Sequence, residues 1–309
     1  MKKNILFLFF SFCSFQLFAQ GDSVYLFCYF KGNGDGLHYA MSKDGYQWQA
    51  MFNDSVVLKP TVSKDKLFRD PCIIRGADGK FHMVWTVSWA DRGIGYASSS
   101  DLVNWSEQRF IPVMVGEDSA RNTWAPEITY DPKKREYVVY WATTIPGRFP
   151  QKDTSAEGQR YNHRMYYVTT KDFEKWSGPK VLYDPGYSVI DASIVHDGGQ
   201  WVMFLKNETR QPAEKNLRVA TAKNLTGPYS AAGPPITGTY WAEGPTAVKI
   251  DGQWVVYFDK YTEKKYGAVA SPDLVNWIDI SGKVSFPKGA RHGTVLKISG
   301  EELKKMQGM

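Results

Sequence analysis

The chain has 309 residues, and 15% of them are aromatic with 11 Trp, a composition that suits a β-rich protein or a carbohydrate binder. Its hydrophobic share of 43% argues against wholesale disorder. The formal charge of +6 falls to about +4 once a leader with two Lys is removed, and no basic run or basic helix follows. We therefore expect neither nucleic acid nor an anionic membrane as a partner.

The first twenty residues have the pattern of a secretory signal. Lys2 and Lys3 form a basic start, residues 5–12 are apolar, and Ala19 ends a cleavage motif. The apolar run is too short to span a bilayer, so the pattern predicts export rather than a membrane anchor. We expect a bacterial protein, periplasmic or extracellular, whose signal peptide (residues 1–19) is removed near Ala19.

From Ser23 onward, short runs of β-branched and aromatic residues alternate with Gly, Asp and Asn, and no segment sustains a helical period. The first strands are predicted at 24–30 and 37–41, with a glycine-rich turn between them. The next pair is predicted at 70–74 and 81–87. This pattern predicts an all-β fold.

Two cysteines follow the leader, Cys28 and Cys72. A disulfide is an alternative in an oxidising compartment, but two cysteines make no framework, and we expect two buried free thiols. No cluster of His and Cys has the spacing of a zinc site.

A phrase that joins Asp, an apolar residue and Trp recurs along the chain. Residues 100–105 (SDLVNW) reappear as 271–277 (SPDLVNW) and, more loosely, as 171–176 (KDFEKW). In each copy we expect the Asp side chain to tie a β-turn and the Trp to pack between neighbouring sheets. Matched copies within units of about 50 residues indicate a repeat architecture. Four short antiparallel strands in each unit are typical of a β-propeller blade.

The repeated units add up to five blades. Four complete units begin at Asp70, Ala125, Asp191 and Glu243. The last strand, 292–298, has no partners after it, and the segment 24–51 has outer strands but no inner strand. Joined, these half-units form a fifth blade, in which the N-terminal strands close the ring by pairing with the C-terminal inner strand. We therefore predict a single five-bladed β-propeller over residues 20–309, with a short polar tail from residue 299. A pair of β-sandwiches, the alternative, does not explain the matching half-units.

Three of the five inner-strand starts carry a carboxylate: Asp70, Asp191 and Glu243. Because equivalent positions of the inner strands face one another across the central channel, we expect these three to converge in one pocket. One such acid alone would more simply cap a turn. Three acids at one repeat position repel one another, however, which costs stability and raises their pKa values without any structural benefit. The longest interruption, residues 144–164, is expected to form an elaborated loop over this site.

Convergent carboxylates suit glycoside hydrolysis. One carboxylate activates water or attacks the sugar, and a protonated carboxyl protonates the leaving oxygen. A third acid can tune the proton donor and hold it in position. No Ser-His-Asp order offers a nucleophilic triad instead.

At these positions the chain resembles glycoside hydrolase family 43, whose members are five-bladed propellers. The resemblance covers about residues 68–298 and rests on motifs in the family's order: Arg69-Asp70-Pro71, Trp124-Ala125-Pro126-Glu127-Ile128, Ile190-Asp191-Ala192-Ser193, Glu243-Gly244-Pro245 and His292-Gly293. The family hydrolyses with inversion. The resemblance therefore implies Asp70 as general base, Glu243 as general acid, and Asp191 as the residue that raises the pKa of the acid and orients it. It also implies that the Asp70 and Glu243 carboxyls stand about 6.5–9.5 Å apart, with room for a water molecule.

Other residues near the strand starts receive secondary roles. Trp89, Trp124 and Trp241 could stack on a sugar, with core packing as the alternative for each. Arg291 could hydrogen-bond sugar hydroxyls or pair with one of the three acids. Glu127 lies two residues further into its strand and is expected to be structural or to support the site.

His292 resembles the family's axial histidine, which often lies beside a hydrated calcium ion in the channel. A hydrogen-bonded histidine without a metal is equally open. The expected chemistry requires no cofactor, and Ca²⁺ in the central channel is the only candidate for a bound ion. The other histidines look like ordinary strand or turn residues: His38, His82, His163 and His196.

The resemblance implies an exo-acting, inverting glycosidase on plant polysaccharide side chains. An α-L-arabinofuranosidase is the first expectation, because this activity is common in the family; β-xylosidase, endo-arabinanase, xylanase and exo-galactosidase are alternatives. The expected partner is an oligo- or polysaccharide that contains arabinose or xylose. Outside the enzymes, a protein-interaction propeller and a non-catalytic sugar-binding propeller stay open, although the latter would lack one of the three acids and all three are present.

Overall fold

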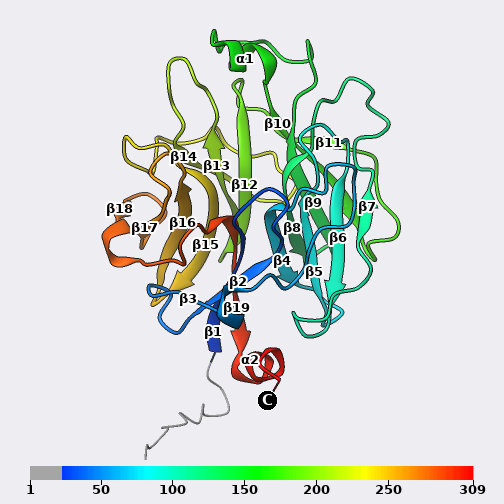
Figure 1. Ribbon diagram of the computed structural model, residues 1–309. Coiled ribbons are helices and arrows are strands. Elements are labelled where there is room, and N and C mark those ends of the chain that lie inside the picture. The colour runs from blue at the N-terminus through cyan, green and yellow to red at the C-terminus, as the bar shows by residue number, and fades with distance from the viewer. Residues whose placement is uncertain (1–22, 309) are drawn as a thin grey trace, which may run out of the picture.

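The computed structural model describes residues 23–308, and the predicted signal peptide of residues 1–19 lies outside this part of the chain (Figure 1). Within it, the strands form five antiparallel sheets, as the repeats predicted. No helix in residues 23–308 is long and apolar enough to cross a membrane. Cys28 and Cys72 are buried and unpaired, as expected.

Four blades follow one another along the chain, each with its inner strand first. Blade 1 contains β4 (Arg69–Arg75), β5 (Phe81–Thr86), β6 (Ile94–Ser99) and β7 (Arg109–Ile111). Blade 2 contains β8 (Trp124–Asp131), β9 (Glu136–Thr143), β10 (Arg164–Thr170) and β11 (Lys180–Tyr183). Blade 3 has three strands, β12 (Val189–Asp197), β13 (Gln200–Asn207) and β14 (Leu217–Ala222). Blade 4 contains β15 (Glu243–Ile250), β16 (Gln253–Lys260), β17 (Lys265–Ser271) and β18 (Ile278–Asp279).

The fifth blade joins the two ends of the chain, which confirms the predicted ring closure. Its strands are, in order, β19 (Arg291–Ser299), β1 (Ser23–Phe30), β2 (His38–Ser42) and β3 (Gln49–Ala50). Two 3₁₀ turns follow the outer strands of blades 5 and 4, η1 (Phe52–Asp54) and η2 (Ser281–Lys283). β1 pairs antiparallel with β19, so backbone hydrogen bonds between the first and last strands close the ring. The inner strands β4, β8, β12, β15 and β19 each contact the next around the centre.

Five hydrophobic clusters hold the blades together, one between each pair of neighbours. Successive side chains of a strand point to opposite faces, so one strand contributes to two clusters. In β5, for example, Met83 and Trp85 pack toward blade 5, whereas Val84 packs toward blade 2. This burial on both faces explains why the inner and middle strands are almost continuously apolar.

The recurring Asp and Trp phrase forms the predicted turn. Asp101 accepts backbone N–H bonds from the residues two and three positions later, at 2.9 and 2.7 Å. The same pair of bonds is made by Asp44, Asp172 and Asp273. The tryptophans that follow these aspartates, which join the clusters between blades, are Trp48, Trp105, Trp176 and Trp277.

The C-terminal residues correct one expectation. The predicted polar tail is the helix α2 (Gly300–Met306), which begins with a reciprocal capping box between Ser299 and Glu302. Leu303 and Met306 of this helix are buried in the cluster between blades 5 and 1. The helix is short and its other side chains are polar, so the sequence pattern alone suggested a solvated tail.

The predicted insertion at residues 144–164 connects β9 to β10 and contains the helix α1 (Ala156–Arg160). The N-cap of α1 is Ser155, whose hydroxyl accepts the N–H of Gly158. Figure 1 shows α1 at the end of the propeller opposite α2 and the start of β1.

Candidate active site

Each inner strand carries a β-bulge near its start. Between Arg69 and Cys72, β4 has one residue more than β5 opposite it, and β8, β12, β15 and β19 show the same register shift. The first residue of the bulge has a positive φ in four of these strands, namely 53° at Asp70, 46° at Ala125, 54° at Asp191 and 61° at Gly244. Most residues at these bulged strand starts line one central pocket.

The bulges define two rings of residues. The bulge ring contains the first bulge residue of each inner strand: Asp70, Ala125, Asp191, Gly244 and His292. The entrance ring contains the residue just before it: Arg69, Trp124, Ile190, Glu243 and Arg291.

Glu243 therefore does not occupy the position equivalent to Asp70 and Asp191, which corrects the alignment of the sequence motifs. The register places Gly244 there and Glu243 one residue earlier. A side chain at residue 244 would collide with His292, because its Cβ would lie 2.3 Å from His292 Cγ. Glycine also adopts the positive φ at no steric cost. The third acid thus reaches the site from the entrance ring.

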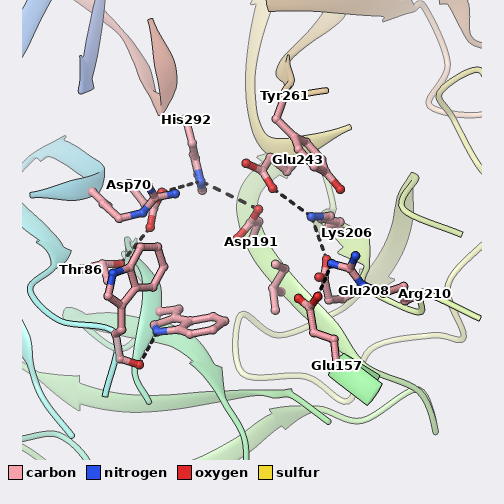
Figure 2. Close-up of a pocket in the computed structure, with 14 residues that line it drawn as sticks. Asp70, Thr86, Glu157, Asp191, Lys206, Glu208, Arg210, Glu243, Tyr261 and His292 are labelled. Atoms are coloured by element: carbon pink, nitrogen blue, oxygen red, sulfur yellow. Dashed lines mark hydrogen bonds and ion pairs between the residues drawn. The ribbon is translucent and has the colours of Figure 1, made fainter. Parts of the chain in front are cut away.

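The two rings open into one pocket of about 240 Å³, and all three predicted acids line it (Figure 2). The other lining residues are Arg69, Thr86, Trp89, Trp124, Glu157, Ile190, Lys206, Glu208, Arg210, Tyr261 and His292. Figure 2 shows Asp70 and His292 on one side, Glu243 and Lys206 on the other, and Asp191 between them. The structure thus brings the three carboxylates together.

Asp70 is held as a carboxylate. Thr86 Oγ1 donates to Asp70 Oδ2 at 3.0 Å, and His292 Nδ1 lies 3.3 Å from Oδ1. Burial alone would raise the pKa of Asp70, but Arg69, His292 and Thr86 outweigh it and lower the pKa to about 2. The Thr86 hydroxyl also accepts the N–H of Ala125 at 2.8 Å, so one side chain ties Asp70 to the next blade.

The pKa of Asp191 is shifted in the opposite direction from that of Asp70. Its Oδ2 accepts the N–H of Gly244 at 3.0 Å and lies 3.9 Å from His292 Nδ1. Burial, with the nearby carboxylates of Glu243 and Asp70, raises the pKa of Asp191 to about 6. At mildly acidic pH Asp191 therefore holds a proton where Asp70 does not.

His292 lies between the two aspartates of the bulge ring. Burial would lower its pKa, but Asp70, Asp191 and Glu127 raise it to about 9, so His292 is an imidazolium. Glu127 is buried below the pocket and does not line it, and burial raises its pKa to about 8. This placement fits the supporting role expected of Glu127.

A calcium ion beside His292 would need a shell of oxygen ligands. Within residues 23–308, no group of three or more His, Cys, Asp or Glu side chains is arranged to hold a metal ion. The imidazolium of His292 also repels a cation. The side chains around His292 therefore do not fit a directly ligated calcium.

Glu243 is bound by a cation at each oxygen. Lys206 Nζ lies 2.9 Å from Oε2, and Arg291 Nη2 lies 3.1 Å from Oε1. Burial would raise the pKa of Glu243, but Lys206 and Arg291 outweigh it and lower the pKa. Arg291 also pairs with Asp259 at 2.5 Å, so of its two expected roles the structure shows the pairing with an acid.

A charged wall extends from Glu243 to the α1 insertion. Lys206 also pairs with Glu208 at 2.7 Å, and Glu208 is shared with Lys215. Further along, Arg210 pairs with Glu157 of α1 at 2.5 Å, and Asp153 accepts the backbone N–H of Arg210 at 2.5 Å. The insertion therefore reaches the pocket as expected, and it does so through Glu157.

Two of the three predicted tryptophans line the pocket. Trp89 is 43% exposed at the rim, and its ring meets Trp124 edge to face with 5.8 Å between centres. Trp124 Nε1 donates to the Trp89 carbonyl at 3.1 Å. Trp241 lies behind Tyr261, at 5.9 Å between ring centres, and is not among the residues that line the pocket.

The sequence interpretation missed the residues opposite the entrance ring. Lys206 pairs across the strands with Ile190, just as Thr86 pairs with Arg69 and Asp259 with Glu243. A signal was present: Lys206 directly follows the apolar run WVMFL of β13, and Glu208 stands two residues later. A charged residue at the end of a strand buried on both faces needs a partner, and here the partner is Glu243.

The known proteins that this chain resembles in sequence are glycoside hydrolases. The glycosyl hydrolase family 43-related family, described as "Probable glycosyl hydrolase domain", matches residues 22–304. An α-L-arabinofuranosidase of Bifidobacterium longum is 26% identical over 245 residues, which cover 67% of this chain and 23% of that protein. A "Probable arabinan endo-1,5-alpha-L-arabinosidase A" of Aspergillus clavatus is 25% identical over 199 residues, which cover 61% of this chain and 57% of that protein.

Among solved structures, an exo-β-1,3-galactanase of Phanerochaete chrysosporium shares the fold. Its TM-score is 0.53 at 16% identity, over 69% of this chain and 49% of that chain. This chain thus spans about a quarter and about half of the length of the two sequence relatives and about half of this structural one.

Proposed function

The chain belongs to the glycosyl hydrolase family 43-related family, and from this premise we propose that it is an exo-acting glycosidase that hydrolyses its substrate with inversion. The observation that supports the proposal most is the contrast between two carboxyls in one pocket. Asp70 is held ionised on one side, and Glu243 stands on the other beside a proton-holding Asp191. An inverting site needs a carboxylate that stays ionised as the base, the role proposed for Asp70, and a second carboxyl across the pocket that delivers a proton, the role proposed for Glu243.

In the proposed reaction, Asp70 accepts a proton from a water molecule whose oxygen bonds to the anomeric carbon. The glycosidic C–O bond breaks at the same centre, and Glu243 gives its proton to the leaving oxygen. When it is ionised, Asp191 adds a negative charge that opposes the ionisation of Glu243, and it helps to orient Glu243 by accepting the N–H of the neighbouring Gly244. One water is consumed, one sugar is released, and the anomeric configuration is inverted.

The pocket size supports exo action. Its volume of about 240 Å³ lies below the roughly 300–1,000 Å³ of sites for drug-sized ligands, so it suits one sugar ring. The insertion supports the same conclusion, because Glu157 of α1 lines one side of the pocket. Charged side chains on one wall and Trp89 with Trp124 on the other offer hydrogen bonds to hydroxyls and a face for the ring.

For the substrate, we propose α-L-arabinofuranosides on plant polysaccharide side chains. The support is the 26% identity to the bifidobacterial α-L-arabinofuranosidase, whose name states that activity. We further propose that the protein acts outside the cytoplasm, on the strength of its leader. N-terminal sequencing of the exported protein would test cleavage near Ala19.

A panel of 4-nitrophenyl glycosides tests the proposal. We expect release of nitrophenol from the α-L-arabinofuranoside, and NMR of the first product should show the inverted anomer. Asp70→Ala and Glu243→Ala should each abolish turnover. If xylosides or galactosides are cleaved instead, only the substrate class is wrong. If turnover survives both substitutions, the three-carboxylate site is not the catalytic centre.

A hydrated Ca²⁺ beside His292 stays a prediction, bound through water rather than through a protein cage. Calorimetric titration of chelator-treated protein with CaCl₂ would detect it. No step of the proposed reaction passes through the ion.

A further inference from the structure

Lys206 is a buried lysine whose bonding capacity is filled inside the candidate site. Its side chain is 2% exposed, and its ammonium group lies 2.9 Å from Glu243 and 2.7 Å from Glu208. Its third direction faces the ring of Tyr261, 4.6 Å from the ring centre. Because an ammonium has three donors, each is met by an acceptor or a π face. Burial would lower the pKa of Lys206, but Glu208 and Glu243 raise it, so the lysine stays charged.

The charged and titratable groups around Glu243 come from four strands and from the segments that follow two of them. The cations are Lys206 of β13 and Arg291 of β19, with His292 also on β19. The acidic groups are Asp191 of β12, Asp259 of β16, and Glu208 and Tyr261 in the segments that follow β13 and β16.

Lys206 and Arg291 do not contribute equally. Arg291 is 32% exposed and divides its charge between Glu243 and Asp259. Water screens an exposed charge, whereas the charge of Lys206 acts through buried surroundings. Glu208, the other partner of Lys206, is compensated in addition by Lys215. Lys206 is therefore the main cation available to Glu243.

This arrangement opposes the role of Glu243 as an acid. A general acid must carry its proton at the working pH, and a cation at each oxygen favours the ionised form instead. We propose that Lys206 is a positioning residue for Glu243, which fixes the orientation of its carboxyl and confines its protonated form to acidic conditions. The inference rests on the proposed function for its kinetic consequence. The alkaline limb of kcat/KM, which reports the free enzyme, should then lie on the acidic side of neutrality.

Two lysines of the same cluster provide a matched test. Lys206 and Lys215 are both buried and both pair with Glu208, but only Lys206 touches Glu243. Lys215 does not line the pocket. In Lys206→Met the alkaline limb should move up by about 1–3 pH units, the usual effect of one close opposite charge. In Lys215→Met it should stay within a few tenths of a unit of the wild type.

A second readout needs no turnover. In protein labelled with [¹³C]glutamate, the Glu243 carboxyl signal is assigned by its loss in Glu243→Gln. The wild-type signal should titrate below 4.5, the ordinary value for Glu, and that of Lys206→Met well above the wild-type midpoint. Lys206→Met keeps Arg291 on Glu243 and Lys215 on Glu208, so we expect it to fold, which its circular dichroism melt would check.

The outcomes separate the two proposals. If no glycoside is cleaved but the Glu243 titration shifts in Lys206→Met alone, the function is wrong and the role of Lys206 stands. If the wild-type signal titrates above about 5, or if Lys206→Met and Lys215→Met behave alike, the role of Lys206 is wrong. The wild-type titration decides this even if a variant does not fold.

Discussion

The bulge ring and the entrance ring differ in how they control a carboxyl, although they are adjacent in the chain. In the bulge ring, Asp70 and Asp191 are bound by a hydroxyl, a backbone N–H and the single imidazolium of His292. In the entrance ring, Glu243 is bound by two long cationic side chains. One residue of register thus separates carboxyls fixed by short, rigid donors from a carboxyl held by ion pairs.

This difference suits the two ends of an acid–base reaction. A base that must stay ionised gains from fixed donors, and the pKa of Asp70 is lowered by the fixed donors His292 and Thr86 together with the charge of Arg69. An acid must gain and lose a proton in each cycle, so its ionisation has to be adjustable. The lysine and arginine side chains beside Glu243 can be changed by mutation or displaced by a ligand, and the ionisation of Glu243 changes with them.

The largest effect is expected from one substitution in each ring, Asp70→Asn and Glu243→Gln. Both keep the shape of the side chain and remove its acid–base function, so each should lower kcat by about 10²–10⁴-fold on a 4-nitrophenyl substrate. On a 2,4-dinitrophenyl glycoside the leaving group needs no proton. Glu243→Gln should then recover most of its activity, while Asp70→Asn should not.

The wild type on both substrates serves as the control for this pair. Equal losses for the two variants on both leaving groups would contradict the assignment of base and acid to the two rings. A recovery of Asp70→Asn alone would reverse it.

The next effect concerns Glu127, one level below the bulge ring. Its pKa is raised from 4.5 to about 8 in the fold, so the folded state binds a proton that the unfolded state releases. The stabilisation is complete below about 4.5 and is lost as the pH rises through about 8. Up to a few kcal/mol of unfolding free energy should therefore disappear across this window.

Glu127→Gln stays neutral, so its melting temperature should fall less than that of the wild type between pH 5 and 8. The exposed Glu301→Gln is a suitable control, because its carboxylate is solvated on α2. Parallel melting curves for Glu127→Gln and the wild type would show that Glu127 is ionised at neutral pH and that its burial does not hold a proton.

The sequence was sufficient to predict the five-bladed ring, but it was not sufficient to predict the register of the inner strands. Repeats such as SDLVNW and SPDLVNW report turns that each blade needs, so blade number and ring closure could be counted from them. The bulges are less visible, because a one-residue shift leaves the motif letters similar. Glu243 and Gly244 are adjacent, and the deciding contact is the clash of a residue-244 side chain with His292, 48 residues away.

The candidate site was also only partly predictable. Asp70, Asp191 and His292 stand at one position of the repeat and Glu243 one residue before it, so the repeat pointed to all four. Lys206 lies near the end of a middle strand, and Glu208 and Tyr261 directly follow two middle strands, where the repeat has no common residue type. Their importance follows from pairing across strands and from burial, which appear only when β13 and β16 are placed against β12 and β15.

The shape of the bulge ring can be tested by its two smallest members. Gly244→Ala should destabilise the fold by about 1–3 kcal/mol, because the new Cβ meets His292 and adopts a left-handed conformation. Ala125→Gly at the equivalent bulge should be nearly neutral, since relief of the positive φ offsets the added chain entropy. Urea unfolding of the two variants measures both changes. Equal stabilities would mean that His292 can move aside without cost.

The smallest expected effect tests the entrance ring as a binding surface. Trp124 belongs to this ring, lines the pocket and contacts Trp89 at the rim, whereas Trp241 lies outside the lining behind Tyr261. Loss of one aromatic face is worth about 0.5–1.5 kcal/mol, so Trp124→Ala should raise KM about two- to tenfold with little change in kcat. Trp241→Ala, matched in residue type, should leave KM unchanged. If Trp241→Ala raised KM as much as Trp124→Ala, substrate would extend over Lys215 and Arg210, whose cations lie 5.7 and 5.6 Å from the Trp241 ring. The binding surface would then continue along the charged wall beyond the residues that line the pocket, as far as Lys215 and Trp241.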